Sequence, residues 1–270
     1  MRDSYPQRIV CLTEETTETL YLFEEDWRIV GISGFTVRPS RARKEKPKVS
    51  AFTSANLDKI LELKPDLVLG FSDLQADIAR ELIRAGIEVH VFNQRDVAGI
   101  LRMLRTLGAL IGVLDKAERL AQQLTQSLQA IRTQAQKLPR RPRIYFEEWD
   151  EPMISGIRWV SELIDIAGGD DCFPELARES LAKNRIIIDP AEVVRRAPDI
   201  IIGSWCGKKF RPEKVCARSG WERTPAVANG QLFEIKSPLI LQPGPAALTD
   251  GVNELARIVG QWTLAKAARN

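Results

Sequence analysis

The densest group of potentially reactive side chains in this chain is the run Glu147-Glu-Trp-Asp-Glu151. Paired carboxylates of this kind could serve as the acid and the base of a hydrolytic enzyme. The run lies in a predicted strand, however, and neighbouring residues of a strand point to opposite faces of the sheet. Glu147 and Glu148 are therefore not expected to act together on one substrate. We predict no catalytic residue here and expect Glu148 to hydrogen-bond a ligand instead.

Aromatic side chains follow several predicted strands. Trp149 and Trp205 fall at the carboxyl ends of two strands, and Phe35 and Phe52 fall in loops of the first half of the chain. Ligands of open parallel sheets bind beyond the carboxyl ends of the strands. Each ring can bury ~150–250 Å² with little loss of entropy, which suits a large, flat and mostly neutral ligand. The competing interpretation is that these rings only cap the edges of the sheets.

Direct binding of a metal is poorly supported by the sequence. The single histidine, His90, lies inside the predicted strand Glu88-Val-His-Val-Phe92, whereas zinc and similar ions need several histidine or cysteine ligands. Haem iron would need an axial tyrosine or histidine, but the tyrosines fall in a tail, a helix and a strand. We predict no metal site and no intrinsic cofactor, so any metal would arrive inside its own chelator or macrocycle.

Composition places the chain among soluble globular proteins. Its 270 residues are 44% hydrophobic and 28% charged, enough for one large domain or two lobes. The formal net charge of +3 is too small to indicate a nucleic-acid partner. No apolar run approaches the ~18 residues of a membrane span, so no membrane insertion is expected.

A helix–proline–strand pattern occurs twice and indicates two similar lobes. Residues 56–71 combine an amphipathic helix, a Lys-Pro-Asp stop and the apolar run Leu-Val-Leu, and residues 190–203 repeat this order with Ala-Pro-Asp and Ile-Ile-Ile. Continuous apolar runs suit parallel strands covered on both faces. Two lobes imply a cleft, which is where a ligand site is expected.

The remaining pattern predicts an α/β fold of two lobes, each with a mainly parallel sheet covered by helices. One long helix over residues 115–138, about 36 Å in length, would join the lobes as a rigid backbone with the ligand cleft between them. The predicted division is therefore an N-terminal lobe (1–114), the linking helix (115–138) and a C-terminal lobe (139–270). In the first lobe we predict strands at 8–12, 29–33, 67–71 and 88–92, helices at 15–23, 56–64, 74–86 and 97–112, and a polar loop at 34–55.

These segments, in order along nearly the whole chain, resemble the substrate-binding proteins of the vitamin B12 and ferric-siderophore ABC importers. Residues 146–156 and 162–169 resemble the start of the second lobe in the cobalamin-type branch, and residues 220–235 and 242–245 resemble its closing elements. The resemblance implies a periplasmic-binding-protein fold with a helical backbone. It also implies a monomeric, non-catalytic protein that captures a small molecule.

The ligand that the resemblance implies is cobalamin or another corrinoid, bound in the interlobe cleft for uptake or intracellular handling. We expect apolar and stacking contacts from the four aromatic residues and hydrogen bonds to the corrin amides from three polar ones. The predicted ligand-binding residues are Phe35, Phe52, Glu148, Trp149, Ser204, Trp205 and Gln242.

Partner docking is implied less directly. Relatives that feed importers carry an exposed glutamate on each lobe that pairs with arginines of the permease. This chain has the shorter Asp58 at the first position, and Ala191 followed by Glu192 at the second. Asp58 and Glu192 are our candidate docking residues, and the substitution at Ala191 weakens the case for a permease partner.

Three alternatives stay open. A ferric-siderophore binding protein shares the fold, although the predicted cleft segments contain or adjoin only Arg38 and Lys208-Lys209 as cations. A cytoplasmic corrinoid chaperone or sensor would have another protein partner, and an enzyme would use the acids of residues 147–151. The sequence as written begins without an apolar leader or lipobox cysteine, which predicts a cytoplasmic protein, or a periplasmic one if a leader was removed.

Overall fold

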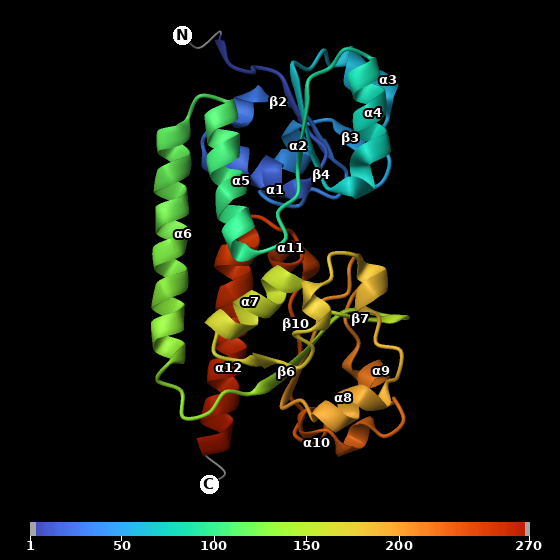
Figure 1. Cartoon of the computed structure of the whole chain (residues 1–270), viewed down its shortest axis with the longest axis vertical. Helices are drawn as coiled ribbons and strands as arrows, with labels where there is room; N and C mark the ends of the chain where they lie inside the picture. Colours follow the sequence, from blue (N-terminus) through green and yellow to red (C-terminus); the bar gives the residue numbers. More distant parts are fainter. Residues whose placement is uncertain (1–3, 268–270) are drawn as a thin grey trace. The chain divides into compact units, whose positions relative to one another are not determined.

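The computed structural model describes residues 4–267, which form two compact units (Figure 1). The first unit comprises the chain up to Gln94 together with Ala98–Gln123, and the second comprises Arg95–Val97 together with the chain from Leu124 onward. Each unit contains one sheet with helices packed on it, as the α/β prediction requires.

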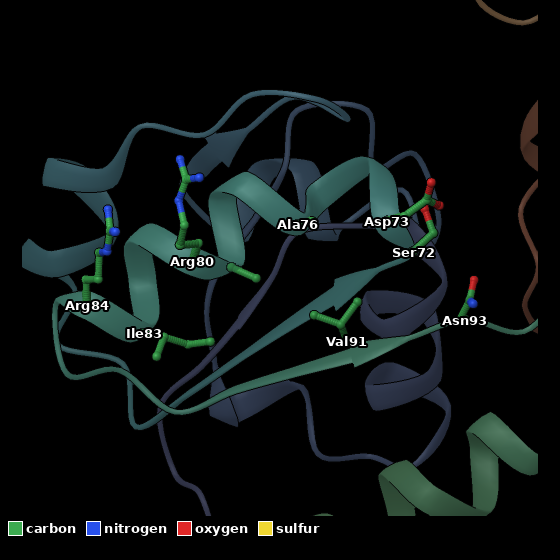
Figure 2. Close-up of a pocket in the computed structure, with 9 residues that line it drawn as sticks. Ser72, Asp73, Ala76, Arg80, Ile83, Arg84, Val91 and Asn93 are labelled. Atoms are coloured by element: carbon green, nitrogen blue, oxygen red, sulfur yellow. The ribbon is translucent and has the colours of Figure 1, made fainter.

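The first unit is built on a five-stranded sheet in which every neighbouring pair is parallel. The strand order is β3 (Lys48–Ser50), β2 (Ile29–Ser33), β1 (Ile9–Cys11), β4 (Leu67–Phe71) and β5 (Val89–Phe92), so β3 and β5 are the edges. Figure 2 shows α4 running alongside β5. The helices are α1 (Glu14–Leu22), α2 (Ala42–Glu45), α3 (Leu57–Glu62), α4 (Ala76–Arg84) and α5 (Val97–Leu110), with short 3₁₀ turns at Asp26–Arg28 and Asp73–Gln75.

The second unit has a sheet of order β10 (Leu232–Glu234), β9 (Ile200–Gly203), β6 (Arg143–Asp150) and β7 (Met153–Ser155), with β8 (Asp170–Asp171) also paired to β6. All pairs are parallel except β6 with β7. Its helices are α7 (Arg158–Ile166), α8 (Ala191–Arg196), α9 (Pro212–Cys216), α10 (Pro225–Ala228), α11 (Ser237–Ile240) and α12 (Val252–Ala267), the last preceded by a π-helical turn at Ala247–Gly251.

The long helix is confirmed as α6, Leu114–Ala135, three residues shorter at its end than predicted. Its buried face carries Ala117, Ala121, Leu124 and Leu128, the spacing expected of an amphipathic helix. The boundary between the two compact units falls within this helix, between Gln123 and Leu124. The three-part division at 114/115 and 138/139 stays a prediction.

The predicted elements of the first unit are confirmed to within a few residues, with two omissions. The stretch 34–55, predicted as a loop, contains α2 and β3. These elements are four and three residues long. Elements so short span little more than one helical or strand period, so no repeat exists for periodicity to detect.

The repeated pattern ends both of its helices in the same unusual way. Lys64 after α3 and Ala197 after α8 each adopt a left-handed backbone with φ of 47°, and each is followed by proline. Proline disfavours the right-handed helical conformation in the residue before it. The left-handed turn then redirects the chain into β4 or β9.

The aspartate after each of these prolines clamps the sheet. The Asp66 carboxylate accepts hydrogen bonds from the backbone N–H of Gln7 (2.7 Å) and of Arg8 (2.9 Å), which lead into β1. The Asp199 carboxylate accepts one from the N–H of Arg143, at the start of β6 (3.0 Å). The two copies therefore fasten the central strand of each sheet to its neighbour by the same side-chain contact.

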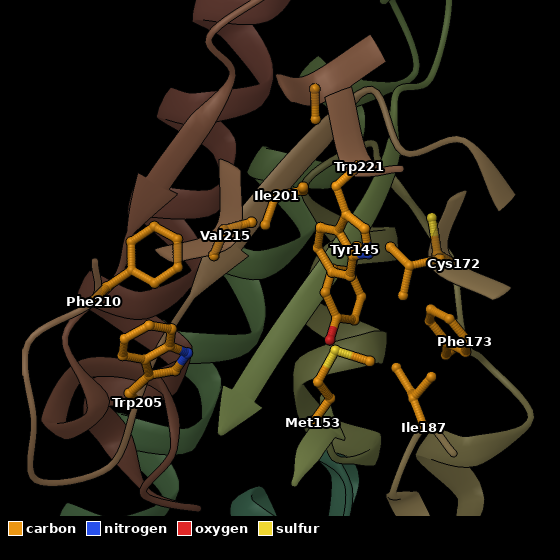
Figure 3. Packing of buried hydrophobic residues seen from close by; sticks show 12 residues of the cluster. Tyr145, Met153, Cys172, Phe173, Ile187, Ile201, Trp205, Phe210, Val215 and Trp221 are labelled. Carbon is orange, nitrogen blue, oxygen red and sulfur yellow. The ribbon is translucent and has the colours of Figure 1, made fainter. Parts of the chain in front are cut away.

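The core of the second unit is rich in aromatic rings (Figure 3). Tyr145 packs edge-to-face on Phe173 and on Trp221, with ring centroids 5.6 Å and 5.8 Å apart. Gly203, the last residue of β9, is required here, because a Cβ at this position would lie 1.8 Å from the Phe210 ring. Phe210 thereby reaches the core from the loop that follows β9.

Candidate functional site

The loop after β2 presents Phe35 on a firmly held backbone. The Phe35 side chain is 56% exposed. The Arg43 guanidinium donates hydrogen bonds to the carbonyls of Gly34 (3.1 Å) and Thr36 (3.2 Å) on either side of it. Arg38 pairs with Glu18 of α1 at 2.8 Å. An exposed ring on a fixed loop can bind a flat ligand with little further ordering of the chain.

Phe52, the second predicted aromatic contact, lies half-buried in the loop after β3. The Gln75 side chain ties this loop to the end of β4, since its amide donates to the Phe52 carbonyl (2.8 Å) and its oxygen accepts from the Phe71 N–H (2.9 Å). The carboxyl ends of β2, β3 and β4 therefore form one cross-linked edge that includes both phenylalanines.

The first turn of α1 buries a carboxyl group at the carboxyl end of β1. Glu15 is 1% exposed, and the Thr13 hydroxyl donates a hydrogen bond to it (2.7 Å). Burial raises its pKa from 4.5 to about 8, an effect to which the nearby Glu14 and Glu18 add. Glu15 is therefore a neutral acid at physiological pH, which nothing in the sequence analysis indicated.

Glu15 makes the stability of the first unit depend on pH. Between its ordinary pKa of 4.5 and its folded pKa of about 8, the folded state keeps a proton that the unfolded state has lost. Stability therefore falls as pH rises through this interval, by about 3 kcal/mol at pH 7. We expect Glu15→Gln to remove most of this fall. Thermal unfolding at pH 5 and pH 8 checks it, with the exposed Glu24→Gln as control, and equal pH slopes in Glu15→Gln and wild type would refute the assignment.

At the end of β6 in the second unit, Glu147 is fully buried and holds a network of donors. Arg218 binds it with two nitrogens (2.6 Å and 3.0 Å), the Tyr145 hydroxyl donates to it (2.8 Å), and the Trp205 indole N–H donates to it (3.0 Å). Burial, and then the Glu147 charge, raise the pKa of Tyr145 well above its ordinary value. This network fixes the loop between Trp205 and Arg218 onto β6.

Glu148 points to a separate set of partners. The Arg185 guanidinium binds it at 2.6 Å and 3.3 Å and also donates to the Ser155 carbonyl (2.6 Å). Arg185 is 2% exposed, whereas the Glu148 side chain keeps 21% of its surface accessible. Glu148 can therefore still accept a hydrogen bond from a ligand while its charge is neutralised.

Trp149 is half-buried, and its indole N–H donates to the Glu151 carbonyl (2.8 Å). The Lys208 ammonium lies 3.9 Å from the centre of its ring and also pairs with the buried Asp150. Although burial alone would raise the pKa of Asp150, the hydrogen bond with Lys208 holds it below its ordinary value. One face of the Trp149 ring is therefore covered by a cation that the protein itself neutralises.

The structure does not support a ligand contact for Trp205. Its ring is 3% exposed and packs edge-to-face on Phe210 with centroids 5.1 Å apart (Figure 3). The position at a strand end suggested an accessible ring, but the indole N–H bond to Glu147 turns it into the core.

Ser204 is 1% exposed, and its hydroxyl finds no hydrogen-bond partner among the described residues. Gln242 lies half-buried between α11 and the π-helical turn.

The candidate docking residues lie at corresponding places in the repeated pattern. Asp58 is exposed in the first turn of α3. Glu192 lies in the first turn of α8 and pairs with Arg195 (2.6 Å) and Arg196 (2.8 Å). A partner's arginine would have to displace these internal pairs at Glu192, so docking at this position stays a prediction.

Within residues 4–267, no cluster of three or more histidine, cysteine or acidic side chains is arranged to hold a metal ion. His90 packs edge-to-face on Phe92 at 4.3 Å, and its partial burial lowers its pKa. In the same range, none of the helices is both long and apolar enough to cross a membrane.

The order of the strands and helices defines an α/β protein of two sheet-containing units, and the sequence comparison identifies its family. Residues 9–239 match the model of the periplasmic binding protein family, so this chain belongs to that family. The resemblance found in the sequence is thereby confirmed.

Individual relatives differ in what they are said to bind. An uncharacterized ABC transporter substrate-binding lipoprotein of Bacillus subtilis is 26% identical over 94% of this chain and 80% of its own length. A vitamin B12-binding protein of Vibrio vulnificus is 24% identical, over 90% of this chain and 86% of its own. A solved periplasmic haem-binding protein from Roseiflexus superimposes with a TM-score of 0.79 at 20% identity, covering 94% and 99% of the two chains.

Proposed function

We propose that this protein binds a corrinoid without transforming it, as a substrate-binding component of uptake or of intracellular handling. The observation that carries the proposal is the pairing of the acidic side chains at the end of β6 with cations. Each one is neutralised by a cation of the same unit: Glu147 by Arg218, Glu148 by Arg185 and Asp150 by Lys208. Such an edge offers aromatic faces and neutral hydrogen-bonding groups, which suits a large ligand with amide side chains.

The same pairing counts against an enzyme that uses these acids. An enzyme that uses these acids as general acid and general base needs two of the carboxyl groups to reach one substrate and exchange protons with it. Glu147 has no exposed surface, and Glu148 is bound by its own arginine. Binding of vitamin B12 by relatives of similar sequence supports a corrinoid ligand, and the family consists of binding proteins. The interlobe cleft and the compartment stay predictions.

Calorimetric titration of the purified protein with cyanocobalamin and dicyanocobinamide tests the proposal. We expect saturable binding of at least one corrinoid with a Kd of ~1 µM or below, which corresponds to about −8 kcal/mol. The absence of heat and of saturation with both corrinoids, in protein that unfolds cooperatively, would contradict the proposal.

A ferric siderophore is the second candidate, and one observation favours it. Lys209 and Arg211 lie exposed in the loop after β9, and no carboxylate of the described residues pairs with either of them. Unpaired cations beside a binding edge would attract an anionic chelate. A ferric catecholate, whose iron centre carries negative charge, titrated in parallel distinguishes the two ligands, because binding of this compound alone would assign the protein to siderophores.

A further inference from the structure

Strand β5 forms one edge of the first sheet. Among residues 4–267, it is the last strand of this sheet and pairs with β4 alone. The Glu88 carbonyl accepts a hydrogen bond from the N–H of Val68 in β4 (2.9 Å), and the Phe92 carbonyl accepts one from the N–H of Ser72, the residue directly after β4 (2.7 Å). Since backbone groups alternate along a parallel strand, those of Val89 and Val91 point away from β4. An unpaired row of this kind is a template for an added strand.

A groove lies beside this edge, between β5 and α4. Its volume is about 640 Å³, and Ala76, Ile83 and Val91 lie along its middle (Figure 2). Ala79 also lines the groove. Ile83 is 60% exposed and Val91 is 39% exposed. The side chains of Val89 and Val91 share the face of β5 toward α4, so a strand added at the edge would place every second side chain over the groove.

Charge differs between the two ends of the groove. Arg80 and Arg84 lie toward the end where β5 begins, and Asp73 lies with Ser72 and Asn93 at the end where β5 finishes (Figure 2). The arginines pair with Asp77 and Glu81 at 3.1–3.3 Å, between side chains that are largely exposed. Exposed pairs of this kind contribute only about 0–1 kcal/mol, so a carboxylate in the groove could replace them.

We propose that this edge and groove bind an extended peptide segment of another protein, added antiparallel to β5, with acidic residues at its carboxyl-terminal end. In that direction the acidic end meets Arg80 and Arg84, and the amino-terminal end meets Asp73. Main-chain hydrogen bonds to Val89 and Val91 supply affinity, and alternate apolar side chains in the groove supply specificity. This surface is independent of the proposed ligand and of its binding residues.

The test uses a fluorescein-labelled peptide of sequence Lys-Val-Thr-Val-Asp-Asp and the charge-reversed peptide Asp-Val-Thr-Val-Lys-Lys. We expect a saturable rise in fluorescence anisotropy with the first peptide and at least about tenfold weaker binding of the second. A tenfold change in affinity is the size of effect expected from one or two surface ion pairs together with electrostatic steering of association. In ¹⁵N-edited NMR spectra, the amides of Val89 and Val91 should shift first. Failure of the first peptide to bind, or equal binding of both peptides, would overturn the proposal.

Two variants distinguish loss of peptide binding at the edge from loss of folding. Val91→Pro removes an N–H that the sheet does not use, and proline is tolerated on edge strands, so we expect an unchanged melting temperature and loss of peptide binding. Arg84→Glu should weaken binding of the acidic peptide and strengthen binding of the charge-reversed peptide. Unchanged peptide binding by Val91→Pro would overturn strand addition. Concentration-dependent dimerisation that the peptide does not displace would also overturn the proposal, because the occupant of the edge would then be a second copy of this chain.

Discussion

Replacing Glu147 with leucine is expected to lower the free energy of unfolding of the second unit by about 3–5 kcal/mol, the usual result of removing one partner of a buried ion pair. The Arg218 guanidinium, whose side chain is 18% exposed, would lose both hydrogen bonds that Glu147 accepts from it. Tyr145 and Trp205 would each lose an acceptor in the core. Urea unfolding followed by circular dichroism measures the loss.

Two further variants show whether the effect comes from the ion pair. Glu222→Leu removes an exposed acid that pairs with Arg223 at 3.7 Å. This variant should lower the free energy of unfolding by less than about 1 kcal/mol. The double variant Glu147→Leu, Arg218→Leu removes both charges and should recover part of the loss. If Glu147→Leu were no more destabilising than Glu222→Leu, Glu147 would not be the centre of this network.

The repeated pattern shows how much of the fold the sequence could predict. Long apolar runs such as Leu67–Leu69 and Ile200–Ile202 have the length and composition of buried parallel strands, and both are found as β4 and β9. Proline marked the helix ends correctly. The roles of Asp66 and Asp199 were not predicted, because each carboxylate bonds to backbone that is more than 50 residues away. A contact of that separation leaves no trace in local periodicity.

The site was less predictable than the fold for a related reason. Trp149 lies near the carboxyl end of β6 and Trp205 just beyond the end of β9, yet the first is half-buried and the second is fully buried. The difference comes from Glu147, which draws the Trp205 indole inward, and from Gly203, which admits Phe210 beside it. Arg185 and Arg218, the cations that neutralise the acids of β6, lie 37 and 71 residues beyond their partners. No spacing rule ties them to residues 147–151.

Truncation of the accessible aromatic rings should have the largest effect on ligand binding. We expect Phe35→Ala and Trp149→Ala each to weaken corrinoid binding about 10- to 100-fold, since a stacked ring contributes its buried area and a further ~0.5–1.5 kcal/mol of aromatic contact. Phe35 is 56% exposed and its loop is held by Arg43, so its removal should leave the fold intact. Calorimetric titration with cyanocobalamin gives the two affinities.

Trp27→Ala is the matched control for both variants. Trp27 is 51% exposed and lies in the turn before β2, at the amino end of that strand, where no ligand contact is proposed. It removes a ring at least as large as either, from a place about as exposed as that of Phe35 and more exposed than that of Trp149. It should therefore change corrinoid affinity less than twofold, a difference of about 0.4 kcal/mol. Equal weakening by Trp27→Ala and Phe35→Ala would mean that exposed rings act only on general stability or solubility. Weakening confined to Phe35→Ala and Trp149→Ala would instead place the ligand at the carboxyl ends of the strands, because these two rings share no other feature of position or partner.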